Sequence, residues 1–327
     1  MNRRAFITVV GASLLCGPLA ADGQQVGKVY RIGYLTVPSR ETAQGVANSF
    51  QLGLCDLGWI AGQNVVIDYR FADSNLDRLP DLAAELALKS DVIVAGANAA
   101  VVATRNATRT KPIVMFLAFD PVGSGLVASL ARPGGNVTGL TVTAGREIYG
   151  KQLQLLKDAF PRVSRVAILV SQISPLDPRA VPEIEIAARA LRLSPQVVRV
   201  RDAGELDQVF AGFGTTHADA IYVSADSMFY QHRARMAQLA AKSRLPAMWG
   251  IREQAEAGGL MAYSTDLNEL ARRAAAFVDK ILKGAKPAEL PVEQPTKFEF
   301  IVNLKTARLL GLTIPQTLLY QANQVIE

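Results

Sequence analysis

Residues 116–139 read FLAFDPVGSGLVASLARPGGNVTG, and this stretch decides the fold class. The apolar run 112–117 that leads into it predicts a buried strand, which ends before Asp120. A short helix is predicted over Leu126–Leu130, followed by a glycine-containing turn and a second strand at 137–140. This order of strand, turn, helix and strand is typical of an open α/β sheet, in which ligands bind at the carboxyl ends of the strands. Asp120 stands at such an end.

The same alternation of short apolar strands and helices continues along the whole chain. Short buried strands that alternate with helices indicate parallel sheets covered on both faces. The units are too numerous for one common doubly wound sheet. The predicted fold is therefore α/β, with two doubly wound parallel-sheet lobes of about five strands each, a ligand cleft between them and a division after Leu140. The helices expected in the second half include 182–193 and one continuous helix over 228–242.

The composition supports two folded lobes and argues against a nucleic-acid partner. The chain has 327 residues, half of them hydrophobic, which is sufficient for two lobes with cores of their own. Its formal net charge of +6 is spread thinly along the sequence. The densest basic groups, such as Arg233 and Arg235, predict a solvated helix face. Cys55 is expected to fill space on the apolar face of a helix.

Residues 1–23 have the organisation of a cleaved export signal. Arg3 and Arg4 form a basic start, residues 5–19 form an apolar stretch, and small residues follow at 21–23. The arginine pair fits the twin-arginine route and equally well an ordinary basic start for the Sec route. The apolar stretch is too short for a typical membrane span. The mature protein is therefore predicted to be periplasmic or otherwise extracytoplasmic.

The sequence lacks the residues that are typical of metal sites, nucleophilic catalysis and phosphate binding. The two histidines, His217 and His232, have no cysteine or histidine at metal-ligand spacing, so no metal is expected. The sequence contains neither a G-x-S-x-G nucleophile motif nor a phosphate-binding lysine loop. The glycines at 134–135 are interpreted as a turn, where glycine supplies positive φ. No catalytic residue and no cofactor is therefore predicted.

The candidate ligand contacts of the first half lie where predicted strands end and helices begin. Ser39 and Asn98 occupy such positions, and the free backbone N–H groups of a helix start attract carboxylates. Plain helix capping explains either residue equally well. Asp120 also has two interpretations, because it can cap the segment that starts at Pro121 or face the cleft and accept a ligand amine.

The candidate contacts of the second half are Ser171, Asp226 and Trp249, which follow predicted strands there. They are expected to face the same cleft from the other lobe. Trp249 is one of two tryptophans, and its ring would suit stacking on a ligand ring or an aliphatic body. Packing of this ring in the core or at a hinge is the alternative, with equal weight.

Several longer phrases of the sequence carry a family resemblance. They are GWIAGQN at 58–64, DPVG at 120–123, LARPGGNVTG at 130–139, GGLM at 258–261, ILKGAKP at 281–287, NLKTA at 303–307 and LGLTIP at 310–315. With them, the chain resembles the exported substrate-binding proteins of ABC transporters from about Val29 to Glu327. The resemblance is to the group with a type I periplasmic-binding fold that includes tryptophan- and phenylalanine-binding members.

The resemblance implies how the chain is divided and how it would work. Lobe 1 would comprise residues 28–142 and 266–290, and lobe 2 would comprise residues 143–265 and 291–327. In such proteins a bound solute bridges the two lobes and favours a closed state. The closed state is the form that a membrane permease recognises.

The resemblance also places ligand contacts. In members that bind amino acids, the cleft ends of three strands supply polar contacts, which correspond here to residues 38–39, 96–98 and 119–120. Phe119 becomes a candidate contact in this way. Alanines at 97 and 99–100 stand where a more polar loop would bind a carboxylate. The resemblance therefore allows a less polar ligand as well as an amino acid.

The function predicted from the sequence is the capture of a small organic solute by a monomeric exported protein without catalytic activity. The solute would be an amino acid or an aromatic or carboxylate compound, and an ABC permease in the inner membrane would receive it. The alternative is a periplasmic ligand-sensing module for a membrane receptor. The isolated histidines disfavour an exported enzyme. A transcription regulator on this scaffold would carry a helix-turn-helix in place of the export signal.

Overall fold

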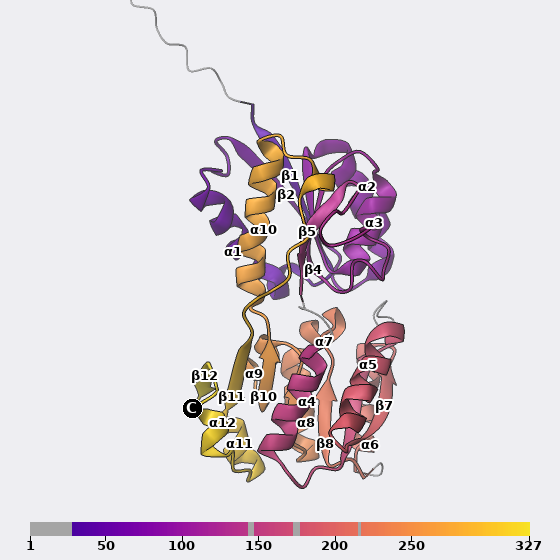
Figure 1. The fold of residues 1–327 in the computed structure, drawn as a ribbon, viewed down its shortest axis with the longest axis vertical. Helices are drawn as coiled ribbons and strands as arrows, with labels where there is room; N and C mark the ends of the chain where they lie inside the picture. The colour runs from indigo at the N-terminus through magenta and orange to yellow at the C-terminus, as the bar shows by residue number, and fades with distance from the viewer. Residues whose placement is uncertain (1–27, 143–146, 173–176, 215–216) are drawn as a thin grey trace, which may run out of the picture.

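The molecule consists of two α/β lobes that follow one another along its long axis (Figure 1). The computed structural model describes residues 28–142, 147–172, 177–214 and 217–327. The predicted export signal at 1–23 lies outside the described residues. The strands of the described part form two separate sheets, each covered by helices. The α/β fold with two parallel-sheet lobes is therefore confirmed.

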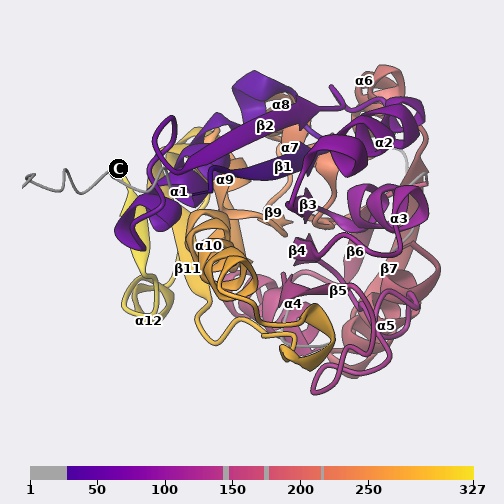
Figure 2. The same ribbon diagram turned by 90° about the horizontal axis from the view of Figure 1, so that it is seen from above.

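The first sheet has the strand order β2-β1-β3-β4-β5, and all neighbouring strands are parallel. Its strands are β1 (Tyr30–Thr36), β2 (Val65–Phe71), β3 (Val92–Gly96), β4 (Ile113–Ala118) and β5 (Val137–Thr141). The central strands are apolar on both faces because helices cover both (Figure 2). One face packs against α2 (Leu79–Lys89) and α3 (Asn98–Ala107), and the other against α1 (Arg40–Asp56) and α10 (Leu267–Leu282).

The second sheet has the order β12-β11-β10-β9-β8-β6-β7, which is seven strands in the described residues against the five or so predicted. The β10 and β11 pair is antiparallel, and the other pairs are parallel. The carboxyl-terminal tail supplies the last two strands of this sheet, at one of its edges. The strands are β6 (Arg165–Ser171), β7 (Ser194–Val200), β8 (Ala220–Val223), β9 (Ala247–Trp249), β10 (Met261–Ser264), β11 (Glu299–Asn303) and β12 (Gln324–Ile326).

The helices of the second lobe also form a layer on each face of their sheet. One apolar core lies under α4 (Glu147–Ala159), α5 (Asp177–Ala190), α11 (Leu304–Leu310) and α12 (Gln316–Leu319). The other lies under α6 (Leu206–Gly212), α7 (Ser227–Gln231), α8 (Arg233–Ser243) and α9 (Arg252–Glu256). Single 3-10 turns occur at Leu76–Arg78, Ala203–Glu205 and Pro287–Glu289.

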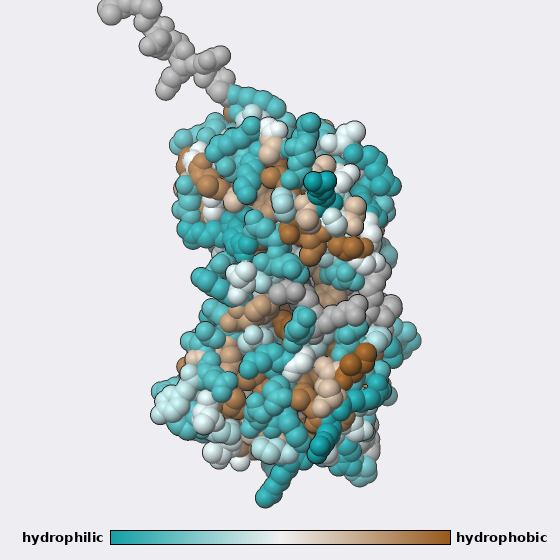
Figure 3. All heavy atoms as spheres, viewed as in Figure 1, coloured by the Kyte–Doolittle hydropathy of each residue, from teal (hydrophilic) through white to brown (hydrophobic). Residues whose placement is uncertain are grey.

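The surface is mostly hydrophilic on the face that Figure 3 shows, and apolar residues are scattered over both lobes, as is usual for a folded chain. None of the helices in the described part of the chain is long and apolar enough to span a membrane. In the same part of the chain, no group of three or more His, Cys, Asp or Glu side chains is placed to hold a metal ion.

The helix predicted over Leu126–Leu130 is wrong, because the chain forms successive turns there. The N–H of Leu126 donates to the carbonyl of Pro121 at 2.8 Å, and the N–H of Gly125 donates to the carbonyl of Val122 at 2.9 Å. Asp120 and Gly125 have φ of 38° and 66°, in the left-handed region that a right-handed helix does not contain. The β4–β5 connection is therefore a coiled loop.

Three further predictions need correction. The helix expected to begin at Pro182 begins at Asp177 and contains this proline in its interior. The continuous helix over 228–242 is divided at His232, whose ψ of 19° interrupts the helical path between α7 and α8. Cys55 is exposed and is not core filler. The short elements α9 and β12 were not predicted, because neither is long enough to show a repeating pattern of hydrophobic residues.

Helix α10 lies in the first lobe, although it comes late in the sequence. The chain passes between the lobes after β5, before α10 and again before β11 (Figure 1). The side chain of Asp266 caps the start of α10 by accepting from the N–H of Asn268 at 2.8 Å. The indole N–H of Trp59 donates to Asp279 at 2.9 Å, and Arg272 forms an ion pair with Asp56. The apolar side of α10 joins the core formed by β1, β3, β4 and α1.

A glycine allows α1 and α10 to approach each other closely. A Cβ atom at Gly53 would lie 2.6 Å from the backbone oxygen of Arg272 and 3.0 Å from the Cβ of Ala275. At Gly45, on the same helix, the nearest atom would be 3.7 Å away, which is an ordinary contact. The close approach therefore depends on Gly53 and not on Gly45.

The substitution Gly53→Ala is expected to destabilise the protein by about 1–3 kcal/mol, because the backbones of α1 and α10 must separate to admit the methyl group. Gly45→Ala, the matched control, is expected to stabilise by about 0.5–1 kcal/mol, since alanine suits a helix interior better than glycine. Urea denaturation of both variants measures the difference. Equal effects of the two substitutions would show that the helices do not pack as described.

Glu253, in α9, is expected to make stability depend on pH. Burial raises the pKa of its carboxyl from an ordinary 4.5 to about 7. The folded state therefore holds a proton between about pH 4.5 and pH 7 that the unfolded state has lost. The stabilisation from this group is fully present below pH 4.5, and it disappears as the pH rises through 7.

The variant Glu253→Gln should accordingly lose less stability than the wild type between pH 5 and pH 8, as measured by urea denaturation. Glu41→Gln is the control, because Glu41 is an exposed glutamate at the start of α1, and it should keep the pH slope of the wild type. An unchanged pH slope in Glu253→Gln would contradict the assignment.

Candidate ligand-binding site

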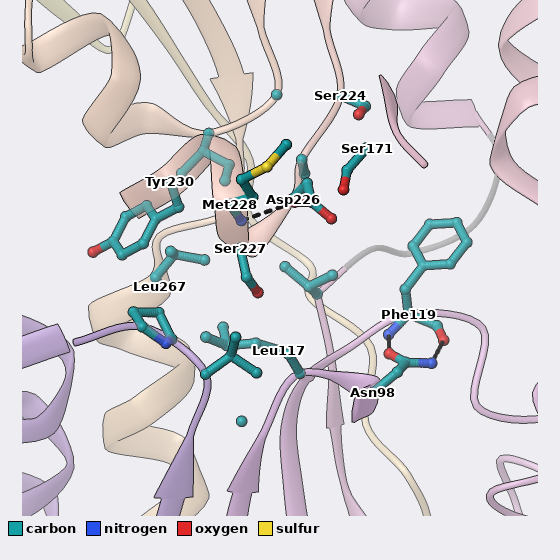
Figure 4. A pocket seen from close by; sticks show the side chains of 18 of the residues that line it. Asn98, Leu117, Phe119, Ser171, Ser224, Asp226, Ser227, Met228, Tyr230 and Leu267 are labelled. Carbon is teal, nitrogen blue, oxygen red and sulfur yellow. Dashed lines mark hydrogen bonds between the residues drawn. The ribbon is translucent and has the colours of Figure 1, made fainter. Parts of the chain in front are cut away.

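The carboxyl ends of the two sheets face each other across a cavity of about 180 Å³ (Figure 4). Parallel strands all end at the same edge of a sheet, so each lobe contributes a wall made of strand ends and helix starts. The first lobe contributes residues at or just after the ends of β1, β3 and β4, and the second lobe contributes residues at or just after the ends of β6, β8, β9 and β10. Four of the predicted contacts line the cavity, namely Asn98, Phe119, Ser171 and Asp226.

Asn98 fixes the first wall by joining the ends of two strands. Its side-chain N–H donates to the carbonyl of Phe119 at 2.8 Å, and its side-chain oxygen accepts from the N–H of Phe119 at 2.7 Å (Figure 4). The same amide nitrogen lies 3.3 Å from the hydroxyl of Ser124. Asn98 is buried, so its hydrogen-bonding capacity is used within the protein. Its main effect is to hold Phe119 at the edge of the cavity.

Asp120 lies beside the wall and is not among the residues that line the cavity. One of its carboxylate oxygens accepts from the N–H of Gly123 at 2.9 Å. A Cβ atom at Gly123 would come within 2.1 Å of the Asp120 carboxylate, so the side chain folds back over this glycine. Of the two interpretations of Asp120, the structure shows the capping contact, made with a turn in place of the predicted helix.

Ser39 caps α1 and contacts the other lobe. Its hydroxyl accepts from the N–H of Thr42 at 3.4 Å. Its backbone N–H donates to the side-chain oxygen of Gln231, and the side-chain N–H of Gln231 donates to the Ser39 hydroxyl, both at 3.1 Å. Pro38, the preceding residue, lines the cavity, whereas Ser39 does not. Ser39 therefore lies at a contact between the lobes.

Trp249 is fully buried in the core of the second lobe and does not line the cavity. A Cβ atom at Gly259 would lie 2.5 Å from the Trp249 indole nitrogen, so the backbone passes close to the ring. Gly250 and Ile251, which follow it in the sequence, do line the cavity. Of the two interpretations of the ring, the structure shows packing in the core.

The wall of the second lobe includes several small polar residues among apolar and aromatic ones. Ser171, Ser224 and Ser227 line it, and the side chain of Ser171 is directed toward the space between Asp226 and Phe119 (Figure 4). Ser171 is buried, and its hydroxyl has no hydrogen-bond partner among the described residues. Asp226 caps α7 by accepting from the N–H of Met228 at 2.8 Å.

The start of α3 offers backbone donors to the cavity. Ala97 precedes the helix with φ of 71°, a left-handed value that an alanine seldom adopts, and no side chain caps this helix start. Ala97 and Ala99 both line the cavity. The first N–H groups of a helix have no partner within the helix, and with the helix dipole they favour a negatively charged group.

Several lining residues that were not predicted from the sequence are aromatic. Phe119 and Tyr149 face each other from different lobes with ring centres 6.1 Å apart. The Tyr222 hydroxyl donates to the side-chain oxygen of Gln152 at 2.6 Å, which ties β8 to α4. Tyr34 also lines the cavity from within β1. These residues lie inside strands and helices, so a search of strand ends does not find them.

The comparisons with known proteins agree on one family. A family model described as ABC transporter substrate binding protein matches residues 34–326. The tyrosine-binding protein of Clostridioides difficile is 24% identical over 314 residues, which cover 93% of this chain and 90% of that protein.

Solved structures are similar over most of the chain. An ABC domain from Streptococcus pneumonia in complex with L-Trp has a TM-score of 0.85 and 28% identity, covering 91% of this chain and 99% of that one. A conserved domain protein from Vibrio cholerae has a TM-score of 0.86 and 23% identity, covering 91% of this chain and 100% of that one. The chain therefore belongs to the family of ABC transporter substrate-binding proteins, which bind solutes and are not enzymes.

Proposed function

We propose that this chain is the exported solute-binding protein of an ABC import system and delivers a small organic solute to a permease in the inner membrane. The observation that carries the proposal is the cavity between the carboxyl ends of the two sheets, with walls from both lobes. A solute held there contacts both lobes at once, so its binding favours the closed arrangement. The names of the similar proteins support an amino acid or an aromatic solute.

The proposal includes a division of the chain at the lobe crossings. Lobe 1 consists of residues 28–142 and 266–290, and lobe 2 of residues 143–265 and 291–327. The packing of α10 against α1 supports the return of the chain to lobe 1. The pairing of β11 with β10 supports the assignment of the tail to lobe 2.

Export and delivery form the second part of the proposal. Residues 1–23 act as a cleaved signal for the Sec or twin-arginine route, and the mature protein is a periplasmic monomer. Its permease recognises the closed form. Permease and ATPase genes beside the gene for this chain would support import over the alternative role of a sensor that acts on a membrane receptor.

The proposed contacts to the solute are the four candidate residues that line the cavity. A carboxylate on the solute binds the uncapped start of α3, where backbone N–H groups provide the donors. Phe119 packs on the apolar body, and Ser171 and Asp226 bind polar groups from the other lobe. Ser39, Asp120 and Trp249 act indirectly, by holding the backbone of the two walls in place.

The first test of this function is thermal stability in a panel of small acids, amino acids and aromatic compounds. A solute that binds only the folded protein should stabilise it by about 2.7 kcal/mol at a hundredfold excess over Kd. The same solute should lower the radius of gyration in solution scattering as the lobes close. Hydrolysis of the solute, or stabilisation without any change in scattering, would contradict the proposed function.

The second test concerns the hydrogen bonds between Ser39 and Gln231, which join the lobes. Gln231→Ala removes these two hydrogen bonds between the lobes, which we propose belong to the closed form, each worth about 0.5–1.5 kcal/mol. Affinity for the solute should fall about tenfold by isothermal titration calorimetry, since 1.4 kcal/mol corresponds to a factor of ten.

Gln44→Ala is the matched control, because Gln44 is an exposed glutamine whose amide donates to Asn48 within α1 at 2.7 Å. It should leave the affinity unchanged. Equal affinities of Gln231→Ala and the wild type would show that this contact does not contribute to closure.

A further inference from the structure

Tyr34, which lines the cavity, has a buried hydroxyl that makes no hydrogen bond within the part of the chain that the structure describes. The residue lies in β1, is fully buried and lines the cavity, and its hydroxyl oxygen has no hydrogen-bond partner among the described residues. Two other buried tyrosines of the lining differ in this respect. Tyr222 donates to Gln152 at 2.6 Å, and Tyr230 donates to the carbonyl of Thr42 at 3.3 Å. Buried polar groups are nearly always paired, so the Tyr34 hydroxyl needs an explanation.

Neighbouring rings hold the Tyr34 side chain in place. Its ring centre lies 5.2 Å from that of Tyr69, 5.5 Å from that of Phe50 and 5.6 Å from that of Phe116. Contacts on these sides leave the ring little freedom to turn toward another partner within the protein. Burial raises the pKa of the Tyr34 hydroxyl well above its ordinary value, so the group keeps its proton. It can therefore donate one hydrogen bond and accept another.

The surroundings of Tyr34 are apolar and come from both lobes. The lining residues that share its apolar core are Val46 from α1, Tyr230 from α7, Ile251 before α9, and Leu267 from α10. Figure 4 shows Tyr230 and Leu267 together on one side of the pocket, away from Ser171 and Phe119. An apolar cavity of about 150 Å³ in another protein binds benzene, so a cavity of about 180 Å³ suits a body of about one ring.

We infer that Tyr34 is a specificity-determining contact for an oxygen atom at the apolar end of the solute. The preferred solute is then about one ring in size and carries a hydroxyl, ether or carbonyl oxygen on that end. This inference rests on the proposed solute-binding function and adds the class of solute. A solute without the oxygen leaves the Tyr34 hydroxyl buried and unpaired, and sites built to bind a hydroxyl discriminate strongly against analogues that lack it.

The test uses pairs of compounds that differ only in a ring hydroxyl, titrated calorimetrically into the mature protein. The pairs are L-tyrosine and L-phenylalanine, 4-hydroxybenzoate and benzoate, and 4-hydroxyphenylacetate and phenylacetate. In at least one pair the hydroxylated compound should bind at least tenfold more tightly. Tyr34→Phe should abolish this preference and leave the affinity for the unsubstituted compound unchanged.

Ser90→Ala is the matched control, because Ser90 also has a buried hydroxyl without a partner among the described residues but does not line the cavity. It should keep the full preference. Tyr34→Phe without solute should melt no lower than the wild type, since it removes an unpaired group; a markedly lower melting temperature would overturn the inference. Equal binding of the two compounds of each pair, a preference retained in Tyr34→Phe, or no binding of any pair would overturn it too.

The experiments distinguish a failure of the role given to Tyr34 from a failure of the proposed solute-binding function. A different solute from the broader panel that stabilises the protein and closes the lobes would support solute binding and refute only the role of Tyr34. Absence of closure with every solute would refute both.

Discussion

The cavity depends on the packing of α10 against α1, because this contact determines which edges of the two sheets face each other. A chain that crossed only once would leave two lobes joined by a single segment. Here α10 returns to the first lobe, and the backbones of α1 and α10 meet at Gly53. Trp59 and Asp279 add a hydrogen bond between the lobe and the returning helix. The carboxyl ends of both sheets lie on opposite sides of one cavity.

The two walls of this space differ in chemistry. The first wall offers backbone N–H groups at the uncapped helix start after Ala97. It also offers the ring of Phe119, whose backbone is held by the Asn98 side-chain amide. The second wall presents serine hydroxyls and the Asp226 carboxylate. The first wall therefore offers hydrogen-bond donors for an anionic group and an apolar surface for a ring. The second wall, opposite it, offers small polar groups. In the function we propose, a single solute satisfies both walls only when the lobes are together, and this would be the physical basis of closure.

Much of the fold could be predicted from the sequence, because buried parallel strands are short apolar runs that end at polar or small residues. The β4 strand and the α10 helix are clear examples. The failures have local causes. Residues 121–126 form turns because Gly125 adopts a left-handed conformation, and the helix after Asp226 breaks at His232 for reasons that no periodicity reveals.

The site was harder to predict than the fold. Reasoning from strand ends identified Asn98, Ser171 and Asp226, which line the cavity because parallel topology brings strand ends to one edge, and the family resemblance added Phe119. The same rule also selected Trp249, whose side chain turns into the core. Tyr34 escaped notice, since the direction of a side chain within a strand and the pairing of its hydroxyl become visible only in three dimensions.

The most direct measurement is mass spectrometry of the small molecules released when the purified protein is denatured. The account predicts one equivalent of a solute of about one ring, with an oxygen atom on its apolar end, which rebinds and closes the lobes. A stoichiometric solute much larger than the cavity, such as an oligosaccharide or a peptide, would contradict it.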